Sequence, residues 1–316
     1  MKSPPQEALL DSVDAAMRAL LTSAERVAER RELPVRIHGE LGSGKEVLAR
    51  FIHEHTPGAS DGPFITFACA GLSEEALRVG LFGAEARACE GATPGAVEQA
   101  AGGTLYLEDI GELPMRLQLE LLLVLKTNRF RRLAGARDLP LDARLIAGSV
   151  HDLTQAARVG SFRADLFHRL DVFRLAIPPL RSRRDDILPL ARWFIEQFSR
   201  QWVRPPTQLT REAEELLAAY EYPGNIRELR NMVESALIAE RGDRLGPSSL
   251  SLGTAATRDD AFFAIYLDRG DTPPTMAEIE RLYLERVLKY AKGNRSEVSR
   301  ILGISYPTVA RKLADI

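Results

Sequence analysis

GELGSGKE, residues 39–46, is the stretch that decides the fold. It follows a short apolar run, PVRIHGE at residues 34–40, and opens a run with helical spacing, GKEVLARFIHEH at residues 44–55. Glycines at this spacing let backbone N–H groups converge on phosphate oxygens, and the lysine reaches the outer phosphates. The stretch therefore predicts a phosphate-binding loop between a buried strand and a helix. The alternative is a glycine-rich turn before a helix, without a ligand.

The residues around this loop alternate between strand-like and helical runs. A helical run is MRLQLELLLVLKTN at residues 115–128, and the strand-like runs are PVRIHGE, PFITFACA at 63–70, GGTLYLED at 102–109 and ARLIAGSV at 143–150. Such alternation predicts an α/β fold, a parallel sheet with helices on both faces. The polar Arg36 and His38 in the first run have no functional account, and we interpret them as satisfied polar positions rather than metal ligands.

The remaining segments divide the chain further. Residues 6–31 carry apolar positions at helical spacing, which predicts an opening helix. Three helices are expected between residues 185 and 242, as a lid, and residues 242–260 read as a Gly/Ser/Thr-rich linker. The apolar positions of the opening helix are Leu9, Leu10, Val13, Ala16, Met17 and Leu20. The predicted domains are an α/β nucleotide-binding part at 1–180, a helical lid at 181–250, a linker at 251–275 and an all-α DNA-binding domain at 276–316.

Composition limits the class of protein. The chain has 316 residues, 45% hydrophobic and 27% charged, with a net charge of −2 and only two cysteines, Cys69 and Cys89. No apolar run has the roughly 20 residues of a membrane span, and the first residues lack the apolar core of a signal peptide. We therefore expect a cytoplasmic protein with reduced cysteines, no membrane contact and no cysteine-based zinc site.

Several long motifs together resemble one family. The chain carries GELGSGKE, GLFG at 80–83, GGTLYLEDIGELP at 102–114, FRADLFHRLDVFRLAIPPLRSRRDDI at 162–187 and YPGNIRELRN at 222–231. In order and spacing these resemble the AAA+ domain of sigma-54-dependent transcription activators over residues 8–250. The resemblance implies binding of ATP and magnesium, homo-oligomers from dimers to hexameric rings, ATP hydrolysis between subunits and remodelling of sigma-54 RNA polymerase. The expected nucleotide contacts are Gly39, Glu40, Gly42, Ser43, Gly44, Lys45, Glu46 and the lid's Arg227, which would couple lid position to nucleotide state.

The acids that follow the third strand stand in an unusual order. Family members usually end this strand Asp-Glu, the first acid holding magnesium and the second positioning water, whereas this chain has Glu108-Asp109. Glu108 is long enough to serve the magnesium, but Asp109 is one methylene shorter, about 1.5 Å. Positioning errors of that size cost about a hundredfold in rate. We therefore expect nucleotide binding to survive better than hydrolysis.

Three further positions bear on catalysis. Val150 stands where the family usually has a polar residue near the outer phosphate. Arg163 and Arg169 match the candidate arginine fingers that act on the neighbouring subunit's nucleotide, a contribution of about 10³ to 10⁵ in related phosphoryl transfers. For each arginine, Arg227 included, the alternative is a surface or helix-stabilising charge.

The loop by which family members contact sigma-54 is altered. Family members read GAFTGA a few residues after a GLFG-like segment, and residues 87–92 of this chain read RACEGA. Cys89 replaces the aromatic residue, and Glu90 puts a charge where a hydroxyl stood, which costs desolvation energy on contact. We expect sigma-54 activation to be weak or absent. The alternative is that a differently shaped loop still docks.

The C-terminal residues resemble a Fis-type helix-turn-helix. A turn at Gly303-Ile304-Ser305 separates two helices, the first of which begins at Asn294 with Glu297 as a capping partner and an apolar face of Val298, Ile301 and Leu302. Tyr306, Thr308, Arg311 and Lys312 are left for double-stranded DNA, at an inverted-repeat operator. The dimer element is expected in the preceding helix, with Ile279, Leu282, Tyr283, Val287 and Leu288. The alternative is a hairpin used only for dimerisation.

The predicted function is a bacterial transcription regulator that binds ATP and specific DNA, with reduced hydrolysis and weakened or lost sigma-54 remodelling. One competing hypothesis is an ATP-hydrolysing activator of sigma-54 RNA polymerase. An unrelated P-loop enzyme would leave the DNA reader unexplained. Because no receiver-like array precedes the phosphate loop, we expect control by a partner protein, by expression or by a ligand acting on the AAA+ domain.

Overall fold

The computed structural model describes residues 12–86, 92–205, 207–240 and 242–250, together with residues 283, 284, 287, 294–302, 304, 306, 308 and 312 near the C-terminus. The chain divides into two compact units, residues 1–252 and 253–316. The first unit holds the sheet and the lid, and the second holds the C-terminal helices. No helix in the described ranges is long and apolar enough to cross a membrane.

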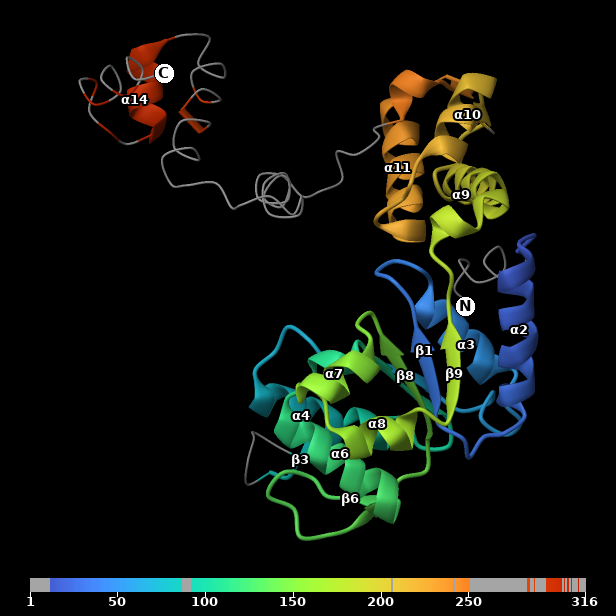
Figure 1. The fold of residues 1–316 in the computed structure, drawn as a ribbon, viewed down its shortest axis with the longest axis vertical. Helices are drawn as coiled ribbons and strands as arrows, with labels where there is room; N and C mark the ends of the chain where they lie inside the picture. The colour runs from blue at the N-terminus through green and yellow to red at the C-terminus, as the bar shows by residue number, and fades with distance from the viewer. Residues whose placement is uncertain are drawn as a thin grey trace. The chain divides into compact units, whose positions relative to one another are not determined.

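A five-stranded parallel sheet forms the centre of the first unit (Figure 1). Its strand order is β2-β5-β8-β1-β9, so β1, which leads into the phosphate loop, is separated from β5, which carries the acids, by β8. The four strands expected from the sequence are present, and β9 at the edge was not predicted. The strands are β1 (Val35–His38), β2 (Phe64–Ala68), β5 (Thr104–Glu108), β8 (Arg144–Ser149) and β9 (Phe173–Ala176).

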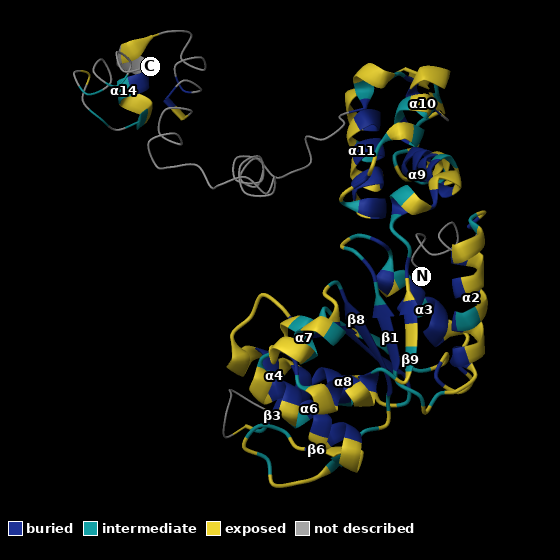
Figure 2. Ribbon diagram, viewed as in Figure 1, coloured by how far each residue is buried: buried dark blue, intermediate teal, exposed yellow. Residues whose placement is uncertain are grey.

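Helices cover both faces of the sheet, so the predicted α/β class is confirmed (Figure 2). Alternate residues of β5 point to opposite cores: Tyr106 packs with α2 and α3, whereas Leu105 and Leu107 pack with α4, α6 and α8. This alternation leaves the strand buried on both sides, as parallel sheets require. The helices are α2 (Ala15–Ala28), α3 (Lys45–Glu54), α4 (Glu74–Phe82), α5 (Ala96–Gln99), α6 (Met115–Thr127), α7 (Leu153–Val159) and α8 (Ala164–Leu170).

Short elements connect these layers. Two small antiparallel ribbons, which the sequence did not predict, join β3 to β4 and β6 to β7. Their bounds are β3 (Gly83–Ala84), β4 (Thr93–Pro94), β6 (Arg129–Phe130) and β7 (Leu139–Pro140). Three 3-10 turns are η1 (Ile110–Glu112), η2 (Leu180–Ser182) and η3 (Arg184–Asp186).

The opening helix is shorter than predicted and turns a different face to the core. It begins after Asp14, whose carboxylate accepts from the backbone N–H of Met17 as an N-cap. Val13 and Ala16 are exposed, contrary to the prediction, while Met17 and Leu20 are buried. The stripe continues through Leu21, Ala24, Val27 and Ala28. Leu9 and Leu10 lie outside the described residues.

The predicted three-helix lid is present as α9 (Ile187–Gln201), α10 (Arg211–Ala219) and α11 (Asn225–Ala239). Their apolar stripes meet in a core of their own that includes Phe194, Leu217 and Met232. Val47 of α3 packs against this core, so the lid rests on the helix that follows the phosphate loop. The lid is completed by β10 (Gln208–Leu209), β11 (Arg244–Leu245) and η4 (Pro247–Ser249).

In the second unit, α14 (Arg295–Leu302) is the described helix. Its Val298 is fully buried and packs with Leu284 and Val287, while Leu302 is half-buried beside them. Ile301, which was predicted to be on the apolar face, is 40% exposed. Tyr283, which was predicted in the dimer element, is exposed, whereas Leu284 and Val287 are buried. Of the predicted apolar face of α14, Val298 and Leu302 lie inward and Ile301 does not.

Two buried arginines hold the sheet to its surroundings. Arg36 of β1 is fully buried and donates to Asp171 through Nε at 2.7 Å. The prediction of satisfied polar positions is therefore met only in part, because Nη1 of Arg36 and Nδ1 of His38 have no partner among the described residues. Arg144 of β8 donates to the carbonyls of Val27 and Ala28 at 2.7 and 2.9 Å, and so caps the end of α2. Burial lowers the pKa of Arg144 to about 10, a cost that these hydrogen bonds offset in part, since Nε has no partner among the described residues.

Asp171→Ala is expected to destabilise the first unit, because it leaves the Arg36 guanidinium buried without a counter-charge. Removing one partner of a buried pair costs about 3 kcal/mol, and a domain of this size loses about 2–4 °C of thermal midpoint per kcal/mol. We therefore expect the midpoint to fall by about 6–12 °C. Asp138→Ala, which breaks the exposed pair with Arg131, is the control and should change the midpoint by about 2 °C or less. Equal shifts for the two variants would contradict this interpretation of Arg36.

Candidate nucleotide-binding site

The phosphate loop lies at the carboxyl end of β1, the edge at which ligands bind in parallel α/β sheets. Gly42 and Gly44 have φ of 72° and 101°, the left-handed region that glycine adopts without strain. Gly44 is followed directly by α3, so the loop runs into a helix N-terminus. The loop therefore has the backbone conformation that GELGSGKE predicts.

Lys45 is buried at the start of α3 and reaches back over the loop. Its Nζ donates to the carbonyls of Gly39 and Glu40 at 3.1 and 3.2 Å, and lies 3.9 Å from Oδ1 of Asp109. Burial lowers the pKa of Lys45, the charges of Asp109 and Glu108 oppose that shift, and Arg227 adds to it. The structure thus brings together the lysine, both acids and the lid arginine named from the sequence.

The two acids occupy different backbone environments. Glu108 is the last residue of β5, whereas Asp109 stands beyond the strand in the left-handed region, with φ of 50°. Among the described residues Oδ1 of Asp109 has no hydrogen-bond partner. A carboxylate oxygen held without a donor beside a buried lysine is a position suited to a ligand or a hydrated cation.

The residues at this site fit a nucleoside triphosphate with magnesium. The hydroxyl of Ser43 is also buried without a partner among the described residues, and Lys45 hydrogen-bonds only the loop's own carbonyls. No group of three histidine, cysteine or acidic side chains that could hold a metal occurs in the described ranges. Magnesium is usually bound through one or two carboxylates and the phosphates themselves, and Glu108 and Asp109 are the carboxylates at this site.

Glu46 does not point its carboxylate at the loop's interior. It forms an exposed pair with Arg50 at 3.3 Å and accepts from Thr66 Oγ1 at the same distance.

Val150 follows β8 directly and offers no polar side chain there. His38, at the end of β1, has a pKa lowered by burial and by the charges of Arg174 and Arg36, and is therefore neutral near pH 7.

The first turn of the lid helix α11 contacts the phosphate loop directly. The carbonyl of Gly42 accepts from the backbone N–H of Ile226 at 3.1 Å and lies 3.4 Å from that of Arg227. A Cβ on Gly42 would stand 2.3 Å from the carbonyl oxygen of Gly224, so only glycine fits. Arg227, predicted as the sensor arginine, is placed at the loop by this contact.

A second set of contacts was not predicted. The carboxylate of Glu40 accepts from Arg181 at 2.8 and 2.5 Å and from the side chain of Asn225 at 3.1 Å. Asn225 also donates to the carbonyl of Leu41 and accepts from the backbone N–H of Leu180. We call Glu40, Arg181 and Asn225 the lid clasp. Asn225 has φ of 51°, a conformation that asparagine tolerates better than most residues.

The segment that connects the sheet to the lid also contacts the phosphate loop. Arg183 is 1% exposed and donates to the carbonyl of Ser43 at 3.1 Å. Asp186 lies 3.8 Å from Arg183 and accepts from the Ser12 hydroxyl at 2.6 Å and the Val13 backbone N–H at 2.8 Å. The start of α2, the lid and the phosphate loop are thereby connected. The charged run RSRRDD was the available sequence signal, but it does not identify partners.

The two candidate arginine fingers lie on or beside α8. Arg169 donates to the carbonyl of Leu125 and lines a cavity with residues that precede β1 and β8. This cavity lies at the amino ends of the strands, whereas the phosphate loop lies at their carboxyl ends. Arg163 pairs with Asp165 at 2.8 Å, and its backbone N–H donates to Gln118. Arg169 is therefore not at its own chain's phosphate loop, which is compatible with action on a neighbouring subunit.

Of the predicted DNA contacts, Tyr306 is 49% exposed, and Thr308 and Lys312 are half-buried. The hydroxyl of Ser299 donates to the carbonyl of Ile304 at 2.5 Å, which ties α14 to the turn that follows it. Arg311 lies outside the described residues, as do residues 87–91 of the altered loop and the linker at 251–275.

The fold, the loop and the lid define an AAA+ nucleotide-binding module. Three family models match the chain: a Sigma-54 interaction domain at residues 10–176, an AAA+ ATPase lid domain at 181–261, and a Bacterial regulatory protein, Fis family, at 275–315. The chain therefore belongs to the family of sigma-54-dependent transcription regulators, with AAA+ and Fis-type DNA-binding domains.

Individual relatives agree. The chain is 37% identical to the transcriptional regulatory protein ZraR of Klebsiella oxytoca, over 95% of this chain and 67% of the relative. It is 35% identical to FlbD of Caulobacter vibrioides, over 96% and 69%. Among solved structures it resembles NtrX of Brucella abortus in complex with ADP, with 32% identity and a TM-score of 0.73 over 96% of this chain and 68% of that one. NtrX has also been solved with ATP, with a TM-score of 0.72.

Glu40→Gln is expected to loosen the lid clasp in a pH-dependent manner. Hydrogen bonds from Arg181 lower the pKa of Glu40 from 4.5 to about 2. Because the folded-state pKa is depressed, the contribution to stability is fully present above about 4.5 and is lost as the pH falls toward 2. The wild type should therefore unfold at a higher temperature than Glu40→Gln at neutral pH, and this difference should shrink only below pH 4.5. A difference that vanishes between neutral pH and pH 5 would contradict the assignment.

Proposed function

We propose that the chain is a DNA-binding transcription regulator that binds ATP with magnesium at residues 39–46 and hydrolyses it slowly. The observation that supports slow hydrolysis is the position of Asp109. Its carboxylate lies 3.9 Å from Lys45, beyond the end of β5, on a side chain one methylene shorter than the glutamate that the family usually has there. A water-positioning group short by about 1.5 Å costs about a hundredfold in rate.

Each residue of the site has a proposed part. Lys45 and the N–H groups of the loop hold the phosphates, and Glu108 holds magnesium, generally through water. Magnesium, when bound, neutralises charge that develops on the transferring phosphoryl group. Arg227 reports the nucleotide to the lid, because it stands beside Gly42 at the start of α11. The remaining loop contacts are Gly39, Glu40, Gly42, Ser43, Gly44 and Glu46.

The competing proposal is an activator that hydrolyses ATP to remodel sigma-54 RNA polymerase. Arg163 and Arg169 favour it, since arginines that act across a subunit boundary stabilise charge in the transition state. Both proposals are compatible with homo-oligomers from a dimer to a hexameric ring. In the slow-hydrolysis proposal the same arginines stabilise an assembly around bound nucleotide, so their presence does not exclude that proposal.

The C-terminal unit is proposed to read an inverted repeat of double-stranded DNA. Tyr306, Thr308, Arg311 and Lys312 would face the DNA, with the earlier positions nearer the base edges. Residues 276–316 contain eight lysines or arginines and five acids, a balance of +3 in a chain whose net charge is −2. This positive balance stands where phosphate contacts are needed.

Restoring the usual order of acids should restore hydrolysis. Glu108→Asp with Asp109→Glu is expected to raise kcat about a hundredfold, measured as phosphate release by the full chain at saturating ATP. Lys45→Ala, which removes the phosphate ligand, is the control and should abolish ATP binding in either background. Rapid turnover by the wild type that Asp109→Ala abolishes would refute slow hydrolysis, and absence of ATP binding by the wild type would refute both versions.

Contact with sigma-54 polymerase is proposed to be weak or lost, through residues 87–92. Docking on a partner needs an apolar tip, and Cys89 and Glu90 stand at the aromatic and hydroxyl positions of the family's loop. A carboxylate buried in an interface without a partner is costly. The chain would then regulate promoters through another sigma factor or by repression.

The double variant Cys89→Phe with Glu90→Thr tests this loop. In a reconstituted assay, open-complex formation by sigma-54 polymerase with ATP should be absent or low for the wild type and should rise in the double variant, because the apolar tip is restored and the charge removed. The readout is also made in the background of Glu108→Asp with Asp109→Glu, so that slow hydrolysis does not hide a working loop. Efficient activation by the wild-type chain overturns the proposal.

A further inference from the structure

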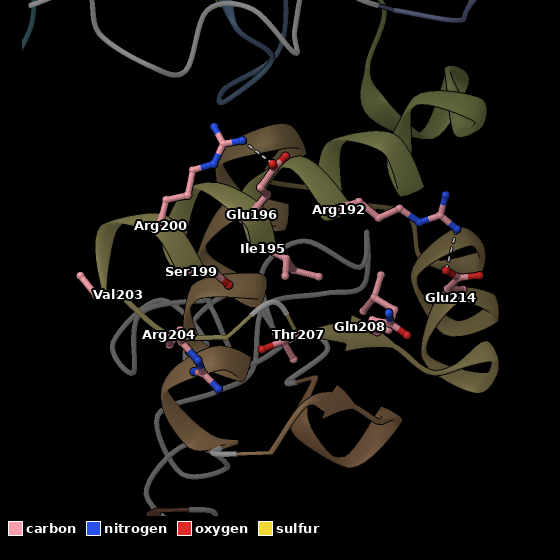
Figure 3. Close-up of a pocket in the computed structure, with 11 residues that line it drawn as sticks. Arg192, Ile195, Glu196, Ser199, Arg200, Val203, Arg204, Thr207, Gln208 and Glu214 are labelled. Carbon is pink, nitrogen blue, oxygen red and sulfur yellow. Dashed lines mark hydrogen bonds and ion pairs between the residues drawn. The ribbon is translucent and has the colours of Figure 1, made fainter.

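The lid contains a cavity that nucleotide binding does not use. It has a volume of about 850 Å³ and lies among the second half of α9, β10 and α10 (Figure 3). Pockets for small molecules span roughly 300–1,000 Å³. The residues around it include Ile195, Ser199, Arg200, Arg204, Thr207 and Leu209. The phosphate loop is contacted instead by the beginning of α11.

Two hydroxyl groups at this cavity have nothing to bind. Ser199 is 5% exposed and Thr207 is 6% exposed, and neither hydroxyl has a hydrogen-bond partner among the residues that the structure describes. A serine in a helix commonly bonds a carbonyl of the preceding turn, but Ser199 does not. An unmet buried hydroxyl costs about 1–3 kcal/mol. Rotation about χ1 is therefore not opposed by an existing bond and can turn either hydroxyl to a ligand.

The charges around the cavity favour an anion. Three arginines and two glutamates line it, which leaves one positive charge in excess. Arg200 pairs with Glu196 at 2.5 Å, with side chains 69% and 56% exposed. Arg192 pairs with Glu214 at 2.7 Å. Figure 3 shows the Arg200–Glu196 pair above the two hydroxyls and the Arg192–Glu214 pair to their right. Exposed pairs of this kind contribute about 0–1 kcal/mol, so an arginine can exchange its glutamate for a ligand at little cost.

Arg204 supplies the unpaired charge. Its guanidinium donates to the carbonyls of Leu237, Glu240 and Gly242, near and beyond the end of α11. No carboxylate lies within ion-pair distance of it among the described residues. The apolar part of the cavity comes from Ile195 and Leu209. A matching ligand has one negative group and a short apolar body.

We propose that this cavity binds a small organic anion, a carboxylate carried on a short aliphatic chain. Arg200 takes the carboxylate in exchange for Glu196, Ser199 and Thr207 donate to the same oxygens, and the aliphatic chain lies against Ile195 and Leu209. Carboxylates accept two parallel hydrogen bonds from a guanidinium, which makes an arginine that can leave its partner suitable. The site does not depend on whether the chain hydrolyses ATP.

The two tryptophans of the chain can report binding through the lid core. Trp193 and Trp202 do not line the cavity, but each is next to a lining residue in sequence, Arg192 and Val203, and both pack against the lid core. The full chain is titrated with butanoate, and with n-butanol, n-butylamine and inorganic phosphate as probes of charge and shape. Butanoate should give a saturable fluorescence change at millimolar concentration, and the neutral and cationic analogues should not. Absence of saturation with butanoate, or a stronger response to phosphate, would overturn the proposal.

Variants at the rim should shift butanoate affinity in opposite directions. Glu196→Gln releases Arg200 and should tighten binding, whereas Arg200→Gln should weaken it, each by about three- to tenfold. The pair Arg211–Glu215 on α10 is another exposed i,i+4 pair, outside the cavity. Arg211→Gln and Glu215→Gln are therefore matched controls and should leave affinity unchanged. Shifts in the same direction for the two rim variants would contradict the exchange.

Ser199→Ala with Thr207→Val tests the hydroxyls. Because neither group has a partner in the described structure, the double variant should unfold at the same temperature as the wild type or higher, while butanoate affinity falls about tenfold. Ser248→Ala, an exposed position elsewhere in the lid, is the control. Unchanged affinity in the folded double variant would remove the hydroxyls from the site.

Discussion

The first unit depends on one close contact, between the carbonyl of Gly42 and the N-terminus of α11. The first N–H groups of a helix have no partner within the helix, and here the phosphate loop supplies one. The approach is possible only without a side chain, since a Cβ at Gly42 would meet the carbonyl of Gly224 at 2.3 Å. A change in the loop's conformation must therefore alter the lid's first turn, and a movement of the lid must alter the loop.

Three buried arginines fix the elements around this contact, namely β1, α2 and the entry to the lid. Arg36 fixes β1 through Asp171, Arg144 fixes α2 through its terminal carbonyls, and Arg183 fixes the lid's entry through the carbonyl of Ser43. Burying a guanidinium is costly unless its donors are satisfied, and each of these three keeps one nitrogen without a partner among the described residues, so the bonds that remain matter more. Each of these arginines therefore specifies one arrangement strongly, because a displaced neighbour would leave a charge buried without compensation. The phosphate loop lies within the frame that these three interactions make.

The sequence predicted the parts of this arrangement that rest on local patterns. Apolar runs next to helical runs predicted β1, β2, β5 and β8, and the glycine spacing predicted the loop. The edge strand β9 was missed because VFRLAI lies inside a long motif that was interpreted only through its arginines. In α2 the buried stripe runs from Met17 to Ala28. Val13 and Ala16 also have helical spacing to this stripe, but both are exposed, so spacing alone did not locate the buried face. The lid clasp joins residues 141 and 185 positions apart, and no local pattern encodes such partners.

The reversed acids gain a physical explanation from the backbone. Asp109 has φ of 50° and ψ of 55°, the left-handed region, where aspartate is found several times more often than glutamate and other longer residues. Its carboxylate makes no capping hydrogen bond, and Oδ1 has no partner among the described residues, so the preference for aspartate rests on the backbone conformation alone. Glu108, still within β5, has extended backbone and tolerates either acid. The order Glu-Asp therefore suits the turn after β5 better than Asp-Glu, while it shortens the reach of the acid beside Lys45. Stability of the turn and reach toward the phosphates thus oppose each other at one position.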